Sequence, residues 1–529
     1  MNSYFSLLFA FVFLPLSILA YGIAPKKARW AVLLGASYLF FWFLSGALVA
    51  FIAASTVSVY LCGLGMARMM AKRDELVKEA PKEKRRIKKE CKRRMRLVLT
   101  AGVAVNIGML VALKYLGFFS GAFSSLLALA GISVPTVVTS IGVPIGISFY
   151  TLMAVSYLVD VYREAVQVDR NIARIALFLS FFPQIMEGPI CRYGQTAQSL
   201  FAGEPLKREN LYAGSLRILY GVAKKVVVAD RLNAFIKPVF DNYASYDGGV
   251  IALAAVLYTF QLYCDFSGTM DVAIGIARIF NVELPENFRQ PFFSRTASEF
   301  WKRWHITLGT WFKDYVYYPV SLSKPCKALT SSARKKLGNR YGPLLASSVA
   351  LLAVWVGNGL WHGAGSQYLF FGLYYFVMIM AGGLIEPVSQ SWAAKLGIDR
   401  NCAAYRAFQI ARTLVVIFVG ELFFRANDLQ AGLGMFSIMV GNFTLDSFLQ
   451  ERIFSMGLDL PDFAIVVVSL LGVLAVGLAK ERGKDPLGSI CSRSALPRWS
   501  VWVALALFIV VFGAYGRGYT PVDPMYAQF

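Results

Sequence analysis

Histidine is almost missing from this 529-residue chain, which contains only two, His305 and His362. Charged residues are scarce at 16%, whereas hydrophobic residues make up 57%. Soluble domains carry about 25% charged residues, so the composition excludes an ordinary soluble protein and indicates an integral membrane protein. The seven cysteines show neither CxxC pairs nor metal-ligand spacing, so we expect neither a disulfide framework nor a metal site. The chain also lacks a GxxxxGK[ST] loop and a GxSxG elbow, which argues against an ATP-driven pump or a hydrolase.

Long hydrophobic runs are abundant. A membrane-spanning helix needs about 20 mostly apolar residues, and many runs of that kind lie between charged stretches. We predict an all-α polytopic membrane protein, a single domain over 1–529 with about ten to twelve transmembrane helices, the shorter runs being re-entrant or interfacial. The first run lacks a preceding basic segment and a cleavage site, so we expect it to be retained. The clearest runs lie near 4–24, 30–45, 48–70, 97–117, 137–159, 172–186, 211–229, 249–280, 343–362, 367–386, 405–424, 462–479 and 498–516.

The net charge of +22 is concentrated in a few segments. Residues 72–96 contain thirteen Lys or Arg and five Asp or Glu, with no interleaved aromatics. A nucleic-acid partner is therefore not expected, and the positive-inside rule predicts a cytoplasmic segment that is also suited to anionic lipid headgroups. The smaller basic groups at 324–340 and 480–484 are placed in the cytoplasm by the same rule.

Helix-breaking residues cluster in the middle of the chain. The segment "GVPIGISFYTLMAVSYLVDVYRE" (142–164) opens with two glycines and a proline, and "FFPQIMEGPICRY" (181–193) contains two prolines and a glycine. Broken backbone at membrane depth is tolerated only where protein or a water-filled cavity satisfies the amide groups. The sequence therefore predicts a polar cavity.

An acidic side chain lies within the apolar run 258–280. Gln261, Asp265 and Thr269 are spaced by four residues and share one helix face. A carboxylate at membrane depth is a functional candidate by default, and the alternative is structural pairing with an Arg or Lys.

The segment "ASEFWKRWHITLGTWFKDYVYYPV" (297–320) predicts one amphipathic helix that lies along the membrane surface or enters the cavity. Its apolar face would contain Phe300, Trp301, Trp304, His305, Leu308, Trp311, Phe312 and Tyr315. The other histidine, His362, lies at the end of the apolar run 343–362, in "GLWHGAG". Each histidine follows a tryptophan and suits general-base chemistry, although a buried histidine with a satisfied hydrogen bond is the simpler alternative.

Several ordered motifs carry a family resemblance. "PIGISFYT", "FFPQIMEGPI", "YCDFSG", "LPENFRQPF", "EFWKRWHITLGTWFKDYVYYP" and "GLWHGAG" are concentrated in 140–365, with a weaker echo in "GELFFRA" (420–426). Together they resemble the membrane-bound O-acyltransferase (MBOAT) family. The resemblance is to the bacterial branch that includes the alginate O-acetyltransferase membrane subunit and the teichoic-acid D-alanyl transferase.

The resemblance implies a catalytic core in 140–365, further transmembrane helices in 400–529, and a ring of helices around a central channel. It implies that His362 is catalytic and that His305 assists or lines the channel. The reaction would transfer an acyl group from a thioester, either acetyl-CoA or an acyl-carrier protein, to a hydroxyl, with no bound cofactor. Candidates to line the channel or orient substrate are Asp265, Gln261, Asn287, Trp304, Trp361 and Asn358.

The interval between the two histidines is 57 residues, longer than is usual in the alginate-type proteins, because a basic loop follows the Tyr-Pro pair. The loop would dock an acidic carrier protein or be a simple cytoplasmic loop. The leading function is O-acetylation of an exported or cell-surface polysaccharide in a bacterial plasma membrane, alone or through a secreted SGNH-type partner. The alternatives are D-alanyl transfer to teichoic acid from a carrier protein and a non-enzymatic transporter.

Overall fold

The computed structural model describes residues 3–128, 142–515 and 519–522, and every regular element in them is helical. Eight helical segments are long and apolar enough to cross a membrane, and three apolar helices of 10–17 residues accompany them. The predicted all-α membrane fold is confirmed for this part of the chain, and the ring around a channel stays a prediction. The eight segments are Lys26–Glu79, Pro81–Tyr115, Gly248–Ile279, Tyr341–His362, Ser366–Lys395, Ala403–Arg425, Leu460–Glu481 and Ala495–Phe512.

Four predicted runs do not coincide with any of these eight segments, and one of them, 4–24, contains the shorter apolar helix Phe9–Ile23. The run 172–186 contains only the nine-residue helix α7, Ile172–Ser180, before a break. The run 211–229 lies in a helical stretch that includes two buried lysines. The start of the run 137–159, up to residue 141, lies outside the described residues.

The chain divides into two compact units. Unit 1 comprises the described residues up to Ser215 together with Val272–Pro285, and unit 2 comprises Leu216–Asp271 and the described residues from Glu286 onward. Helices α10 (Arg208–Val222) and α12 (Gly248–Ile279) contribute residues to both. The other helices of unit 1 are α1 (Leu14–Ile23), α2 (Arg29–Ser45), α3 (Val49–Glu79), α4 (Lys84–Leu110), α5 (Leu116–Ala128), α6 (Ile147–Tyr162), α7, α8 (Phe182–Ile185) and α9 (Tyr193–Phe201).

Unit 2 contains the chain's two histidines. A π-helical stretch, η6 (Ala223–Ala229), joins α10 to α11. Its other helices are α11 (Asp230–Asp241), α13 (Ala297–Arg303), α14 (Ile306–Phe312), α15 (Tyr318–Ser321), α16 (Lys324–His362), α17 (Ser366–Lys395), α18 (Ala403–Arg425), α19 (Leu429–Gly441), α20 (Asp446–Leu449), α21 (Leu460–Glu481), α22 (Pro486–Cys491) and α23 (Ala495–Phe512).

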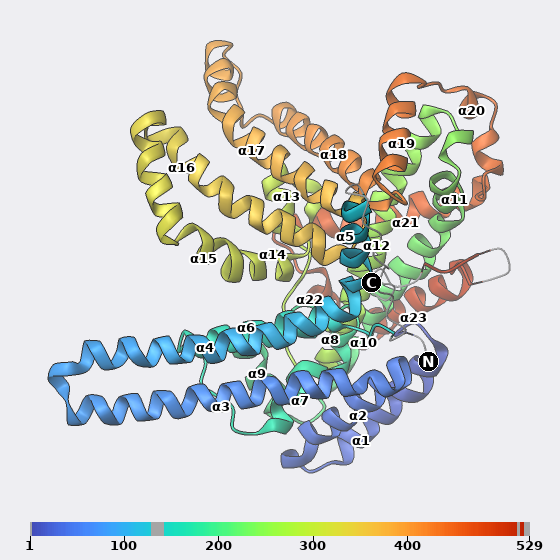
Figure 1. Cartoon of the computed structure of the whole chain (residues 1–529). Coiled ribbons are helices and arrows are strands. Elements are labelled where there is room, and N and C mark those ends of the chain that lie inside the picture. Colours follow the sequence, from blue (N-terminus) through green and yellow to red (C-terminus); the bar gives the residue numbers. More distant parts are fainter. Residues whose placement is uncertain (1–2, 129–141, 516–518, 523–529) are drawn as a thin grey trace. The chain divides into compact units, whose positions relative to one another are not determined.

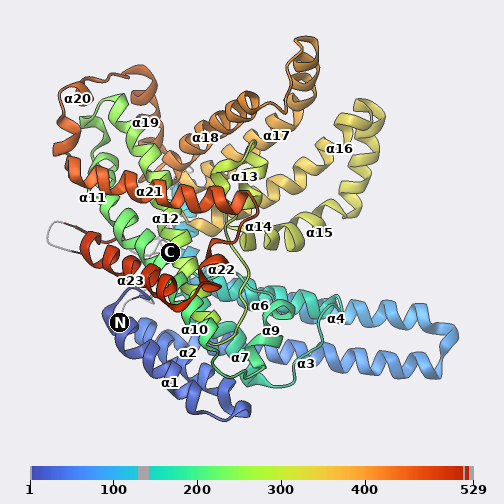
Figure 2. The ribbon, with the colours of Figure 1, turned by 180° about the vertical axis from the view of Figure 1, so that it is seen from behind.

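The basic segment 72–96 forms the end of a long helical hairpin in unit 1. Helices α3 and α4 lie side by side in both views (Figures 1 and 2), and residues 80–83 connect them. Within the apolar part of the hairpin, Asn106 of α4 donates to Ser58 of α3 at 3.4 Å and accepts from Ser55. These polar contacts satisfy a buried amide and fix the pairing of the two helices.

The basic stretch between the two histidines is helical, which corrects the prediction of a loop. Helix α16 begins after Ser323, whose hydroxyl caps the amide of Cys326, and Pro325 occupies the first turn. Ala, Leu, Lys and Arg then favour a helix up to Gly338, where φ is +75° and the helix kinks. The stretch therefore forms a separate helix before the kink, and the helix that ends at His362 begins after it.

The predicted breaks in 142–164 and 181–193 are confirmed within unit 1. Helix α6 begins only after Gly146, and the chain is irregular between α8 and α9. Gly146 has φ +70°, and a Cβ atom at this position would lie 2.0 Å from the carbonyl oxygen of Ile185. Glycine is therefore required at position 146 by the left-handed backbone conformation and by the close approach of the Ile185 carbonyl.

We expect Gly146→Ala to lower the thermal stability of the detergent-solubilised protein by several degrees. The methyl group would strain a left-handed residue and push apart two irregular segments. The matched control is Gly35→Ala in α2, where no atom lies within 4 Å of an added Cβ. The loss of monodisperse protein on heating would measure both variants, and equal melting curves for the two would contradict the assignment.

Candidate functional site

His305 lies at a break between two short helices, which corrects the prediction of one continuous amphipathic helix over 297–320. Helix α13 ends at Arg303 and α14 begins at Ile306, and His305 between them has φ +46° and ψ +52°. A non-glycine residue rarely adopts this left-handed conformation, so the surroundings must hold it in place. The His305 side chain is 3% exposed.

Asn287 organises this break. Its backbone carbonyl accepts from the amide of Ile306 at 3.0 Å. Its side-chain Oδ1 accepts from the backbone amide of Thr307 at 2.9 Å and from the Thr307 hydroxyl at 3.0 Å, and it lies 3.3 Å from His305 Nδ1. The buried amide therefore replaces the hydrogen bonds that the interrupted helix cannot make.

The contacts of Asn287 also set the tautomer of His305. The Thr307 backbone amide can only donate a hydrogen bond, so the Asn287 atom beside it must be the oxygen. His305 Nδ1 must then carry a hydrogen and donate it to the same oxygen. Burial lowers the pKa of His305 from 6.5 to about 3, so the ring is neutral near pH 7. The lone pair of the neutral imidazole is then on Nε2, the atom that a base would use.

His362 is the last residue of α16 and is 5% exposed. Its ring meets those of Phe424 and Phe371 edge to face, with centroids 5.0 and 5.9 Å apart. Helix α16 can approach α17 closely here because Gly359 faces the carbonyl of Tyr368, where a Cβ atom would lie 2.4 Å from the oxygen. Gly359, just before the "WHG" motif, thus allows the end of α16 to pack closely against α17.

Trp361 is the neighbour that the two histidines share. Its ring centroid lies 5.6 Å from that of His305 and 5.0 Å from that of His362. Asn358 lies one helical turn before His362, is 8% exposed, and its Oδ1 has no hydrogen-bond partner among the described residues. The structure therefore brings five predicted site residues, Asn287, His305, Asn358, Trp361 and His362, into one buried region of unit 2.

Trp304 lies instead in an aromatic cluster. Its ring stacks on that of Phe300 at 5.3 Å and meets Phe288 edge to face at 5.0 Å. These contacts pack α13 against its neighbours, so Trp304 supports the adjacent His305 through the backbone.

Gln261 and Asp265 belong to a separate buried polar cluster. They share one face of α12, as predicted, and both meet the η6–α11 stretch. Gln261 donates to the carbonyl of Ala229 at 3.0 Å, and Asp265 lies 2.8 Å from the ammonium of Lys225. This arrangement matches the alternative of structural pairing, and neither side chain is linked to a histidine by a contact among the described residues.

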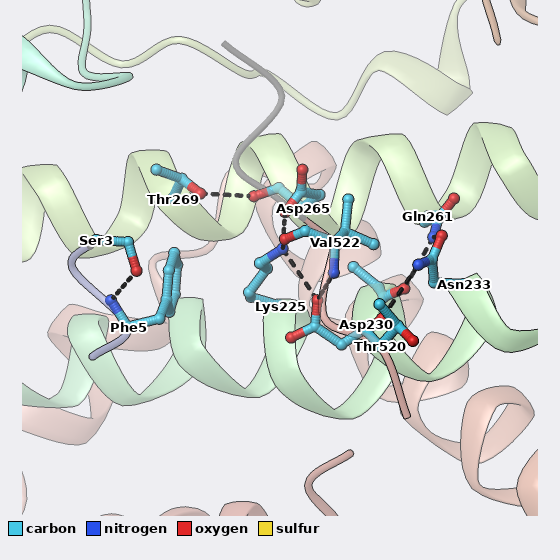
Figure 3. Close-up of polar contacts among 11 residues, drawn as sticks. Ser3, Phe5, Lys225, Asp230, Asn233, Gln261, Asp265, Thr269, Thr520 and Val522 are labelled. Carbon is cyan, nitrogen blue, oxygen red and sulfur yellow. Dashed lines mark hydrogen bonds and ion pairs between the residues drawn. The ribbon is translucent and has the colours of Figure 1, made fainter. Parts of the chain in front are cut away.

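Lys225 is the centre of this cluster (Figure 3). Its ammonium also contacts Asp230 at 3.0 Å and donates to the carbonyl of Val522 at 2.5 Å, and the amide of Val522 donates to Asp230 at 2.9 Å. A second buried group next to it contains Lys224, which lies 2.6 Å from Asp271. A buried charge is tolerated only when it is paired and hydrogen-bonded, as these are.

Three residues of this region were not predicted from the sequence. Lys225 interrupts an apolar run, and an ionisable residue in such a run is itself a signal. Thr307 gave no signal because its role depends on the break at His305. Glu421 lies in "GELFFRA", is 1% exposed, and is one helical turn from Phe424, which touches His362. No group of three His, Cys, Asp or Glu that could hold a metal ion is present among the described residues.

Comparison with known proteins identifies the family to which the chain is similar. A profile of the MBOAT, membrane-bound O-acyltransferase family, matches residues 85–333. A probable alginate O-acetylase AlgI from Azotobacter vinelandii is 30% identical over 473 residues, covering 88% of this chain and 84% of that protein. A peptidoglycan O-acetyltransferase from Helicobacter pylori is 28% identical over 82% of this chain and 79% of its own length. A teichoic acid D-alanyltransferase from Bacillus subtilis is 27% identical, over 47% of this chain and 61% of its own length.

The chain belongs to the membrane-bound O-acyltransferase family. It is therefore a multi-pass membrane enzyme that takes an acyl group from a donor and transfers it to an acceptor, and the resemblance inferred from its motifs is confirmed.

We expect Asn287→Asp to move the acidic limb of the pH–rate profile for acyl transfer toward neutral pH. The carboxylate would keep acceptors for Thr307 and His305, but its negative charge would raise the pKa of His305 from about 3 and favour the imidazolium as pH falls. An imidazolium has no lone pair, so activity should fall at a higher pH than in the wild type.

The matched control for Asn287→Asp is Thr307→Val, which removes one hydroxyl bond to Asn287 without adding charge. Its rate should fall at all pH values without a shift of the profile. If Asn287→Asp also lowers the rate uniformly from pH 5 to 8, Asn287 has only a structural role.

Proposed function

We propose that this protein transfers an acetyl group from a thioester to a hydroxyl of an exported or cell-surface polysaccharide, with His362 as the general base. The observation that carries the proposal is the burial of both histidines of the chain around one tryptophan, Trp361. Support for the substrate class comes from the relatives, whose names include alginate O-acetylase and peptidoglycan O-acetyltransferase.

The chemistry requires one proton acceptor at the hydroxyl. A hydroxyl is a poor nucleophile at its ordinary pKa, so the imidazole of His362 removes its proton as the oxygen attacks the thioester carbonyl carbon. The carbon–oxygen bond forms, the carbon–sulfur bond breaks, and the proton passes to the departing thiolate. The products are the ester and the free thiol, so the imidazole is regenerated.

The surroundings of His362 suit this step. The aromatic rings of Trp361, Phe371 and Phe424 enclose the imidazole and limit the access of water, which would otherwise hydrolyse the thioester. His305 lies on the other side of Trp361 and has a lone pair on Nε2. It assists by accepting a hydrogen bond from the hydroxyl substrate or by lining the path of that substrate. Asn358, with its oxygen one turn before His362, orients substrate or imidazole.

The donor and the location follow as parts of the same proposal. The donor is acetyl-CoA or an acetylated carrier protein, and the protein lies in the plasma membrane of a bacterium with its basic segments on the cytoplasmic side. The acyl group reaches the polysaccharide directly or through a secreted SGNH-type acetyltransferase. Support for a bacterial membrane comes from the bacterial sources of the relatives.

D-alanyl transfer to teichoic acid is the second candidate, because D-alanyltransferases are also among the relatives. Their similarity covers 47% of this chain against 88% for the alginate O-acetylase, which favours the acetyl group. Family membership favours both over the transporter alternative.

The test is the ester-linked acyl content of envelope polymers, released by mild base and identified by mass. Cells would carry the wild type, His362→Ala, or the control Trp392→Ala, an exposed aromatic of α17, at equal membrane abundance. We expect acetate to fall about 10²–10⁴-fold with His362→Ala and to stay unchanged with Trp392→Ala, because loss of a general base costs about that factor.

Each other outcome of this experiment changes a defined part of the proposal. Release of D-alanine in place of acetate would replace the acyl group and keep the role of His362. An acyl content that His362→Ala leaves intact would contradict the catalytic role of His362.

A further inference from the structure

A small cavity lies at the base of the α3–α4 hairpin in unit 1, away from the histidines in sequence. Its volume is about 240 Å³, and it is lined by Arg73 of α3, by Lys88, Lys92 and Met95 of α4, and by Glu164 just beyond α6. The cavity is smaller than the roughly 300–1,000 Å³ of typical sites for whole small molecules, so it suits a single charged group.

The charges around this cavity are unequally paired. The Arg73 guanidinium is 2.5 Å from Glu164 and 2.8 Å from Asp74, and its side chain is only 13% exposed, so both carboxylates are occupied by one cation. No carboxylate lies within 4.0 Å of the ammonium of Lys88 or Lys92 among the described residues. The two lysines therefore leave the cavity with an excess of positive charge.

The position of the cavity along the hairpin corresponds to the headgroup layer of a bilayer. The uncharged part of α3 ends at Ala67 and that of α4 begins at Leu97, so Arg73 and Lys92 lie six and five residues outside it, and Lys88 lies one helical turn farther out. At 1.5 Å per residue the offsets of Arg73 and Lys92 are about 9 and 8 Å, near the outer edge of a headgroup layer of about 5–8 Å. Leu97, on the membrane side of the cavity, is 68% exposed and available to a lipid tail.

We propose that this cavity binds the phosphate of an anionic lipid, with the phosphate between Lys88 and Lys92 and the acyl chains along the apolar surface below. Juxtamembrane lysines attract anionic headgroups, and a phosphodiester with one negative charge compensates part of the excess. Arg73 and Glu164 form the fixed wall that joins α3 to the end of α6, so a bound headgroup also clamps the hairpin to that helix.

The test compares two pairs of substitutions with the same spacing and the same change of charge. Lys88→Gln with Lys92→Gln removes both ammonium groups of the cavity. Lys89→Gln with Arg93→Gln removes two exposed cations of the same helix that do not line it. The full-length protein would be purified in mild detergent and titrated with phosphatidylglycerol or phosphatidylcholine, and bound lipid would be counted by native mass spectrometry.

We expect the Lys88 and Lys92 pair to weaken phosphatidylglycerol binding about 30-fold, the effect of removing two juxtamembrane charges, and to leave phosphatidylcholine unchanged. The Lys89 and Arg93 pair should have little effect. Equal losses in both pairs would assign the binding to the general charge of the hairpin and overturn the cavity as its site. Displacement of the lipid by millimolar inorganic phosphate or coenzyme A would overturn the lipid assignment in favour of a soluble phosphate.

Discussion

The removal of polar side chains from water is the constraint on which the rest of this structure depends. A buried polar group without a partner costs a few kcal/mol, and a buried charge costs more. Unit 2 nevertheless buries both histidines and several carboxylates and ammonium groups. It does so by two different solutions. Charges are neutralised in pairs, as at Lys225 and Lys224. His305 is kept neutral by burial and held by the amide of Asn287, whereas His362 packs among aromatic rings.

The ion pairs and the neutral histidines have different roles within the unit. The ion pairs join α12 to the η6–α11 stretch and, through Val522, to a distant segment of the chain, so they fix a scaffold. Phe266, the residue after Asp265, touches the His305 ring at 4.8 Å, so the helix that the ion pairs anchor also forms a wall of the histidine region. A neutral imidazole keeps the lone pair that can accept a proton from a hydroxyl, and the aromatic rings around it leave little space for water, which suits transfer of an acyl group in preference to its hydrolysis.

The class of fold could be predicted from the sequence, and a candidate site could be named, because both depend on local patterns. Apolar runs predict spanning helices, and the "RWH" and "WHG" motifs drew attention to His305 and His362. Features that depend on partners distant in sequence could not be predicted from these local patterns. The break at Trp304–His305 was predicted as a continuous helix, since its aromatic spacing is helical and only the contacts of Asn287 make the interruption favourable. Asp265 could be predicted to need a cation, but periodicity alone could not identify Lys225, 40 residues earlier.

The most direct test of His362 as the base uses the purified protein in lipid vesicles, with release of free thiol from acetyl-CoA measured in a single turnover after addition of a hydroxyl acceptor. With the wild type, thiol release should require the acceptor and should match the ester formed. With His362→Ala, both should be lost together while the protein keeps its melting temperature. Acceptor-dependent thiol release at the wild-type rate in His362→Ala would contradict the role of this histidine.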